Sequence, residues 1–370
     1  YRDEGRKVQT EAIGKWQVQS LGFDINRGQL PTFLYSKGLS AKLKNYHKKW
    51  ADSLNISKVP SMEIDFTKNR ITLDSFELQP RYSKALFGLT YGKQIDRIEV
   101  LNVHSRLEGV DFQRLLYQGE AHIKSCMLGI TKINVHTDKT LGPDVAKIKK
   151  MPQEALQEFG LPLQIDFTRL SGWDITYEEK ISSMDPGRIS FHNFGANISC
   201  FSNMPFVADT CNTRLKVQSG LMKQGKVKLR IDIPLSHPDD MFSFKGSVNN
   251  MDMREINPLL NSLALIDITR GRTYGMEFNG SADRYFATGE MDFRYSKLKV
   301  RVLDADGNSN KVKNRLISII ANRFVIKSNN RVFPKIGKID FTRDEHKSIF
   351  NYGAKSLLTG IKETIGLKNK

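Results

Sequence analysis

The sequence has no apolar run that could cross a bilayer as a helix, because none approaches about 18 consecutive apolar positions. Its three cysteines are too few for a fold built on disulfides, and no Cys/His spacing is typical of a zinc site. Low-complexity segments are absent as well. Hydrophobic residues nevertheless make up 39% of the 370 residues, which is a composition typical of a folded protein.

Catalytic signatures are also missing from the sequence. There is no Gly-x-Ser-x-Gly elbow, no His-Glu-x-x-His pair, no phosphate-binding P-loop and no Gly-x-Gly-x-x-Gly. Adjacent carboxylates occur at Glu178–Glu179 and Asp239–Asp240, but neighbours on a strand point to opposite faces and cannot act together. We expect them in solvent-exposed loops. We therefore predict no enzyme activity, no catalytic residue and no cofactor.

Three histidines, His104, His122 and His136, would make a metal site if they stacked on neighbouring strands. However, His104 and His136 alternate with other polar residues along their segments, which places them on polar faces. We therefore predict solvated surface histidines and no metal site.

The sequence is rich in apolar/polar alternation of period two, which is the signature of half-buried strands. A hairpin is predicted where Ile64–Phe66 and Ile71–Phe76 flank a turn at Lys68–Asn69. Such alternation is typical of antiparallel sheets with one wet face, since parallel strands buried on both faces read as continuous apolar runs. The same alternation recurs at residues 163–168, 173–178, 227–233, 274–282 and 285–295.

The parity of the alternation changes at two places. Apolar positions are odd at Ile189 and Phe191 but even from Phe194 onward, so the change falls at His192–Asn193. A second change falls at Ser296–Lys297. Because a one-residue slip would invert every side chain, each change predicts a β-bulge or a turn that restores the face, with a simple loop as the alternative.

Helical periodicity is rarer. Spacings of three and four predict a helix at Leu39–Leu54, and shorter helices are predicted at Pro152–Phe159 and Glu255–Leu263. Longer helices are predicted at Val312–Phe324 and at about Asp344–Gly366. Because no helix alternates regularly with single strands, a doubly wound parallel fold is disfavoured.

The chain has 57 Lys and Arg against 40 Asp and Glu, a net charge of +17, which favours anionic partners. More than half of this excess lies in residues 301–370. There a basic C-terminal helix could lie on an anionic membrane surface. The interpretation we prefer is that this helix packs its apolar face on the sheet and leaves its lysines in water. Nucleic-acid binding is not expected, because no nucleic-acid module can be recognised.

The cysteines allow two interpretations. Cys126 lies in a strand-like segment and is expected to be a small core residue. Cys200 and Cys211 bracket residues 201–210 and could close them as a disulfide in an oxidising compartment. Two free thiols are the alternative.

Three stretches together resemble the AsmA-like proteins of Gram-negative bacteria, in the form common in Bacteroidetes. Met151–Asn203 has a short helix, a strand ending in Tyr-Glu-Glu and a Pro-Gly turn. Phe244–Asp304 passes through an Asn-Pro helix to long strands with Gly-x-Met and Tyr-x-x-Leu-x-Val. The third stretch is the end of the chain, Arg343–Gly366. The resemblance covers most of residues 150–370.

The resemblance implies a periplasmic protein held in the inner membrane by an N-terminal helix, which would precede Tyr1. Relatives among the bridge-like lipid transfer proteins have a long, strongly curved antiparallel sheet that forms a groove with an apolar floor. We therefore expect a mainly β (α+β) fold, groove- or clamshell-like, with short amphipathic helices. The best internal boundary is near Leu141–Pro143, which divides N-terminal β units at 1–142 from an AsmA-like region at 143–370, or else marks a point within one continuous sheet.

This resemblance also assigns candidate site residues. Phospholipid or another anionic lipid is the expected ligand, because Met and aromatic side chains suit acyl chains and each buried methylene contributes about 0.8 kcal/mol. Cations of opposite parity, Lys297, Lys299 and Arg301, are candidates for headgroup contacts at the rim. The competing interpretation is that the same apolar face packs on helices or on a second sheet. The candidate groove residues are Phe242, Phe244, Met276, Phe278, Met291, Phe293 and Tyr295.

The function expected from the sequence is thus binding or conduction of phospholipid along an apolar β groove, in support of outer-membrane homeostasis. The alternative is a structural or assembly module that contacts envelope proteins through exposed sheet edges. An envelope enzyme acting on glycans is a third hypothesis, and it would require a cleft with converging carboxylates.

Overall fold

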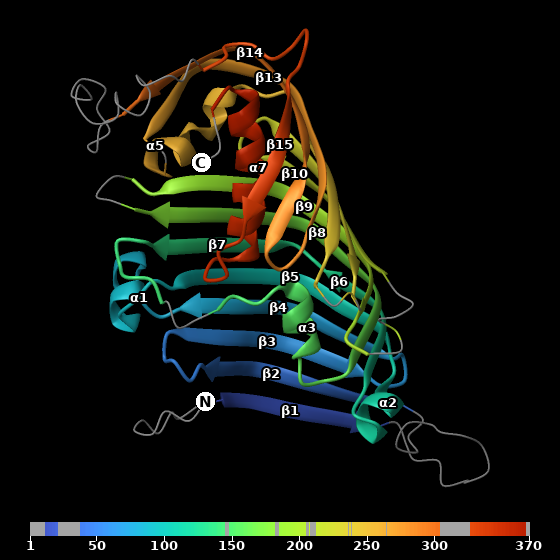
Figure 1. Cartoon of the computed structure of the whole chain (residues 1–370). Helices are drawn as coiled ribbons and strands as arrows, with labels where there is room; N and C mark the ends of the chain where they lie inside the picture. The colour runs from blue at the N-terminus through green and yellow to red at the C-terminus, as the bar shows by residue number, and fades with distance from the viewer. Residues whose placement is uncertain are drawn as a thin grey trace.

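The computed structural model describes residues 12–20, 38–144, 148–181, 185–204, 207, 212–235, 237, 239–263, 265–303 and 326–367. In this part of the chain, fifteen strands form a single sheet, as the sequence predicted (Figure 1). The strands are β1 (Ala12–Ser20), β2 (Leu39–Lys49), β3 (Asn55–Asp65), β4 (Arg70–Pro80), β5 (Asp96–Val110), β6 (Ala121–Leu128), β7 (Thr131–Asp138), β8 (Leu163–Lys180), β9 (Gly187–Ser202), β10 (Asn212–Leu221), β11 (Gly225–Pro234), β12 (Phe242–Val248), β13 (Ile266–Ala282), β14 (Phe286–Val302) and β15 (Ile336–Thr342).

Short helices occupy the connections and the end of the described chain. They are α1 (Lys84–Tyr91), α2 (Phe112–Tyr117), α3 (Pro152–Gln157), the 3₁₀ turn η2 (Met253–Ile256), α5 (Asn257–Leu263) and α7 (Ile349–Thr364).

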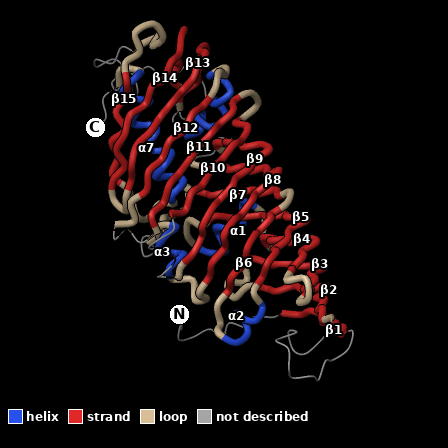
Figure 2. Tube along the Cα trace, turned by 90° about the vertical axis from the view of Figure 1, so that its right-hand side faces the viewer, coloured by secondary structure: helices blue, strands red, loops and turns tan. Residues whose placement is uncertain are grey.

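The sheet is strongly curved, and α3 and α7 lie within its curve (Figure 1). After a turn of 90° about the vertical axis, the strands pass in front of these helices (Figure 2). We call the side that carries α7 the inner face and the opposite side the outer face. The predicted curved sheet with short helices is therefore confirmed.

Neighbouring strands are antiparallel throughout, except around β8. Strands β6 and β7 lie end to end beside β5, and both run parallel to β8. Gly129 occupies the break between them, where an added Cβ would lie 2.3 Å from the carbonyl oxygen of Val103. Only glycine allows the two backbones to approach this closely.

The parallel pairing requires a long crossover, which residues 139–162 supply. This segment contains Leu141–Pro143, the predicted internal boundary. The sheet nevertheless continues across it, since β7 and β8 are directly hydrogen-bonded neighbours. The sheet is therefore continuous across the predicted boundary.

Both predicted parity changes are β-bulges. In β9 the bulge lies at Asn193, which has a φ of 47°, and the β9–β10 register shifts beside it. In β14 it lies at Lys297, which has a φ of 54°, and the β13–β14 register shifts there. Each bulge restores the apolar side chains to the inner face, as the alternation requires.

The predicted helix at Leu39–Leu54 is wrong, because these residues form β2 and the turn that follows it. Another bulge explains the error. Asn45 has a φ of 53°, and the β1–β2 register shifts beside it, so the side-chain parity changes. Leu43 and Tyr46 therefore both approach Gly14, although they are three residues apart. A bulged strand thus imitates the spacing of a helix.

The other predicted helices are present where the structure describes them, whereas α1 and α2 were not predicted. α3, α5 and α7 fall within their predicted ranges, and η2 begins two residues before the predicted start at Glu255. The predicted helix Val312–Phe324 lies outside the described residues.

The main hydrophobic core lies between α7 and the last strands of the sheet. Leu357, Ile361 and Ile365 from the helix end pack on a cluster that includes Met291 and Ile339. The C-terminal helix therefore packs on the sheet, which is the interpretation the sequence favoured over a helix lying on a membrane.

Candidate functional site

A row of apolar side chains crosses almost the whole inner face. Each residue of the row is the direct cross-strand partner of the next, so all of them point to the same side of the sheet. Thr168 is the only member with a polar side chain. From β1 to β15 the row consists of Val18, Ala41, Ile64, Ile71, Leu107, Cys126, Thr168, Ile198, Leu215, Ile231, Phe244, Gly280, Gly289 and Ile339.

A second apolar row lies beside the first, two residues away from it on each strand. Ser105 on β5 interrupts it, since Ser105 is the partner of Leu73. Beyond that strand the row resumes and reaches the residues under α7. This part consists of Leu128, Leu170, Ala196, Val217, Leu229, Gly246, Phe278 and Met291.

The middle of the inner face and its C-terminal end differ in how far they are covered. Between β3 and β11 the larger members of the first row, such as Ile64, Leu107, Leu215 and Ile231, are only half-buried. Under α7 the apolar side chains are completely enclosed, and Met291 has 0% exposure. The apolar rows are therefore partly accessible to solvent in the middle of the sheet and sealed at its C-terminal end.

Four of the predicted groove residues belong to the sealed end. Met291, Phe293 and Tyr295 are 0 to 3% exposed, and Phe278 is buried with them in the core that α7 covers. The hydroxyl of Tyr295 donates to the carbonyl oxygen of Lys327 at 2.9 Å. These four residues form the protein's own core, as the competing interpretation required, and do not line an open groove.

The remaining predicted groove residues lie at the border of this core. Phe242, Phe244 and Met276 are half-buried and pack against its edge. Phe244 also belongs to the first apolar row, and its ring lies over Gly280, where an added Cβ would be 2.8 Å away. Phe244 is therefore the predicted residue that joins the sealed core to the half-buried face.

The predicted rim cations differ in their surroundings. Lys297 lines a small hollow of about 400 Å³ together with Arg270 and Arg272. Lys299 is exposed opposite Arg270 on the neighbouring strand. Arg301 donates to the carboxylate of Asp267 at 2.7 Å, so its charge is already matched.

A buried charged cluster lies where β7 and β8 end. Glu178, only 5% exposed, accepts hydrogen bonds from Lys84 at the start of α1 and from Arg188 at 2.6 Å. His136 Nδ1 lies 3.5 Å from the same carboxylate. Beside it, Tyr177 donates to Glu179 at 2.6 Å, and Lys139 pairs with Glu179. The cluster ties α1 to the sheet.

This cluster corrects two predictions. Glu178–Glu179 is buried at a strand end and is not a solvated loop. His136 is 5% exposed and is not a surface histidine, because α1 packs against β7. The alternation of the sequence places His136 on the polar face of its strand. It contains no signal, however, that a separate segment of the chain covers that face.

The pKa values in the cluster follow from these contacts. Burial of the His136 imidazole, with a further contribution from Lys84, lowers its pKa below the usual 6.5. Burial alone would raise the pKa of Glu178, but hydrogen bonds from Lys84 and Arg188 outweigh it and hold that pKa below 4.5.

The other two histidines of the predicted set lie on β5 and β6. His104 is exposed, and His122 lies beside Glu120 at 3.3 Å. In the part of the chain that the structure describes, no group of three His, Cys, Asp or Glu side chains is arranged to hold a metal ion.

The cysteines occupy distinct states. Cys126 is a buried free thiol, and burial raises its pKa. Cys200 is disulfide-bonded. Cys211 lies outside the described residues.

Two further observations concern membranes and relatives. Among the described residues, no helix combines the length and hydrophobicity that a bilayer span requires. No protein-family model matches the chain, and no curated protein matches it either.

Proposed function

We propose that the protein binds the acyl chains of lipids on the half-buried part of its inner face, between β3 and β12. The observation that supports this proposal is the unbroken cross-strand register of the first apolar row. An acyl chain lying along the row would cross a strand about every 4.8 Å and meet an apolar side chain on each except β8, where Thr168 stands. Because each buried methylene contributes about 0.8 kcal/mol, many weak contacts would hold the lipid without one specific pocket.

The register also suits movement of a lipid. Consecutive members of the row, such as Ile198, Leu215 and Ile231, are chemically similar and equally half-buried. A lipid displaced by one strand would therefore exchange one set of contacts for an equivalent set. We propose that lipid is conducted across the strands in this way, as expected for a non-enzymatic, AsmA-like lipid transport protein.

An anionic lipid is the favoured ligand. Three cations, Lys297, Arg270 and Arg272, line a hollow near the ends of β13 and β14, together with Asp252 and its partner Arg254. These cations have the parity opposite to the apolar rows, since Arg272 is the partner of Ser296, so a phosphate headgroup would reach them around the strand ends. Residues Lys299 and Arg301 of the predicted rim are less suited, because one stands outside this hollow and the other is paired with Asp267.

The proposal includes a periplasmic location, with anchoring in the inner membrane and a role in outer-membrane homeostasis. The disulfide at Cys200 supports an oxidising compartment, because disulfides persist where thiols are not kept reduced. The cellular role can be tested by deleting the gene and growing the cells in a detergent that penetrates a leaky outer membrane. Poorer growth of the deletion strain than of wild type is expected.

Site-specific photocrosslinking tests the lipid site directly. A photoreactive phenylalanine analogue would replace Ile64 or Ile198 on the inner face, and matched controls would replace Glu63 or Ser199 on the outer face of the same strands. We expect lipid adducts by mass spectrometry from the inner positions alone. Adducts of equal yield from both faces, or none from the inner face, would contradict the proposal.

A specific observation favours a second candidate function, docking of an envelope protein at the sheet edge. In the described structure β1 is an edge strand paired only with β2. Its apolar side chains are open, with Trp16 59% and Val18 65% exposed. An extended segment of a partner could pair with β1 and cover these side chains. Crosslinking from Trp16 in cells would yield a protein adduct if this function holds, and lipid adducts alone if it does not.

A further inference from the structure

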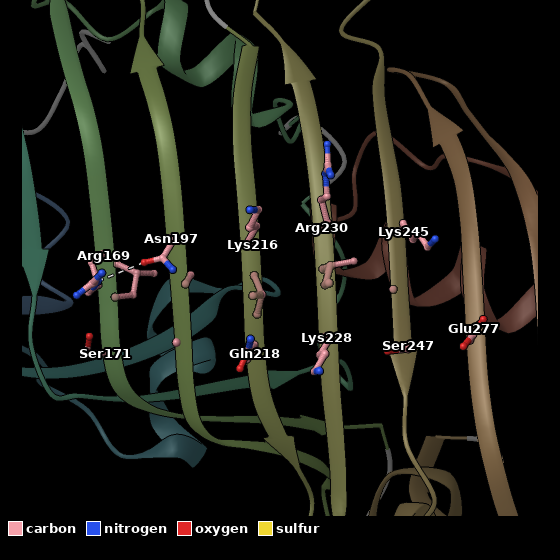
Figure 3. Close-up of a pocket in the computed structure, with 16 residues that line it drawn as sticks. Arg169, Ser171, Asn197, Lys216, Gln218, Lys228, Arg230, Lys245, Ser247 and Glu277 are labelled. Atoms are coloured by element: carbon pink, nitrogen blue, oxygen red, sulfur yellow. Dashed lines mark hydrogen bonds between the residues drawn. The ribbon is translucent and has the colours of Figure 1, made fainter.

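The outer face carries a hollow of about 630 Å³ that the lipid proposal does not use. It lies over β8 to β13, and Figure 3 shows its lining from outside, with helices behind the sheet. Its side chains are mainly cationic or uncharged polar. Those of the outer face are Arg169, Ser171, Asn197, Lys216, Gln218, Lys228, Arg230, Lys245, Ser247 and Glu277.

The cations of the hollow stand in cross-strand register. Lys216, Arg230 and Lys245 are direct neighbours on β10, β11 and β12, and Asn197 links Lys216 to Arg169 on β8. Neighbouring strands are about 4.8 Å apart, so the three adjacent cations span about 10 Å. This is too wide for a single phosphate, but it suits a ligand that carries several.

Most of these charges have no partner within the described chain. Lys216, Lys228 and Lys245 make no ion pair with any described residue. By contrast, Arg230 donates to Asp232 at 2.6 Å, and Arg214 shares the same carboxylate. The hollow therefore presents lysine charges that are not neutralised, with Glu277 as the only acidic residue of its lining.

Backbone irregularities shape the hollow. β8 has a bulge at Gly172, with a φ of 68°, and β9 has one at Asn193. These neighbouring bulges bend and twist the sheet next to Ser171 and Gln218. Gly195, on the outer face between them, adds no side chain, which leaves space over the backbone.

We propose that this hollow binds a ligand with two or more phosphate groups on a polar frame such as a sugar. The unpaired lysines would hold the phosphates by charge-assisted hydrogen bonds. Ser171, Ser247 and Gln218 would bond to hydroxyl groups between them. The site is separate from the lipid face, because its side chains point to the opposite side of the same strands.

Titration calorimetry with inositol hexakisphosphate as a probe tests the site. We expect Lys216→Gln/Lys245→Gln to weaken binding at least about tenfold, since two charge-assisted contacts are lost. The matched control, Lys44→Gln/Lys132→Gln, removes two other exposed lysines that make no ion pair with a described residue, and it should bind as wild type does. Equal weakening of both double variants, or no binding by wild type, would overturn the proposal.

A third variant separates the shape of the hollow from its charge. Gly195→Val keeps every charge, and its Cβ would meet only the carbonyl oxygen of Leu170, at an ordinary 3.5 Å. The variant should therefore fold, which circular dichroism would verify, but its larger side chain should fill the hollow and weaken binding of the probe. Unchanged binding by the folded variant would overturn the proposal.

Competition identifies where the phosphates come from. Vesicles of phosphatidylcholine with phosphatidylglycerol are added to the complex of protein and probe, with pure phosphatidylcholine vesicles as the control. If only the anionic vesicles displace the probe, the site binds phosphates that belong to membrane lipids. If neither kind of vesicle displaces it, the site binds a free phosphorylated ligand. Because the Ile64 and Ile198 crosslinks report on the other face, failure here leaves the lipid proposal intact.

Discussion

Gly337 on β15 rests directly against Gly360 on α7, so closely that an added Cβ on Gly337 would lie 2.2 Å from the carbonyl oxygen of Gly360. The two glycines thus allow the backbone of the helix to approach that of the strand. The contact brings Leu357 and Ile361 onto Met291 and seals the C-terminal end of the apolar face. The point at which the half-buried face ends is therefore set by a glycine pair.

Substitution of Gly337 by Ala should displace α7. Because the clash involves backbone that cannot rotate away, we expect a loss of about 2 kcal/mol or more in the free energy of unfolding. Urea denaturation followed by circular dichroism measures this loss. Gly353→Ala in the same helix is the matched control, because an added Cβ there meets nothing within 4 Å. It should be neutral or stabilise by up to about 1 kcal/mol, and equal losses in both variants would contradict the role of the close contact.

The sealed and half-buried parts of the inner face should respond differently to truncation. Met291→Ala would leave a cavity in an enclosed core, and we expect it to cost about 2 to 5 kcal/mol. Ile198→Ala removes a half-buried side chain that faces the curve, and it should cost roughly 1 kcal/mol. The same urea titrations measure both values. A cost for Ile198→Ala as large as that for Met291→Ala would show that this part of the face is also a closed core.

Local patterns allowed much of the sheet to be predicted. Alternation identified most of the long strands, and the parity changes at Asn193 and Lys297 identified two bulges. Strands and bulges depend on residues that are close in the sequence, so a short stretch of sequence is enough to predict them. The packing of α7 was also predictable, because its apolar positions recur at helical spacing.

The pairing of distant strands in the sheet could not be predicted from such local patterns. The apolar row becomes visible only when Leu107 is known to face Cys126, or Ile231 to face Phe244. Seven groove residues were predicted from the C-terminal strands, yet α7 covers four of them, because the sequence contains no sign of where a distant helix will pack. Ile64 and Ile198, on the half-buried part, were not singled out for the same reason.

Arg284 is expected to hold α3 in place. It lies in the β13–β14 turn and pairs with Glu154 of α3 at 2.7 Å and with Glu345 at 3.1 Å. Because these groups are partly exposed, Arg284→Gln should change global stability little. We expect faster hydrogen exchange in Pro152–Gln157, measured by mass spectrometry. Arg294→Gln, which removes a pair formed with Asp292 on its own strand, is the control and should leave exchange in α3 unchanged.

The buried cluster around Glu178 should make the attachment of α1 sensitive to acid. His136 has a folded pKa below 6.5, so the unfolded chain binds a proton more readily than the folded one, and stability falls as the pH drops through that range. Glu178 has a folded pKa below 4.5, so its contribution is lost only at lower pH, in the same direction. Charging His136 beside Lys84 would weaken the contact that holds the start of α1.

Hydrogen exchange in α1 measures this effect. We expect exchange at Lys84–Tyr91, corrected for its intrinsic pH dependence, to become faster between about pH 7.5 and about pH 5.5, where histidine takes up its proton. His136→Gln cannot titrate and should remove most of the change, whereas His104→Gln alters an exposed histidine and should leave it intact. If His136→Gln retains the full pH dependence, another group must control α1. If wild type shows none, His136 takes up its proton equally whether α1 is attached or detached, and its titration is not linked to the attachment of the helix.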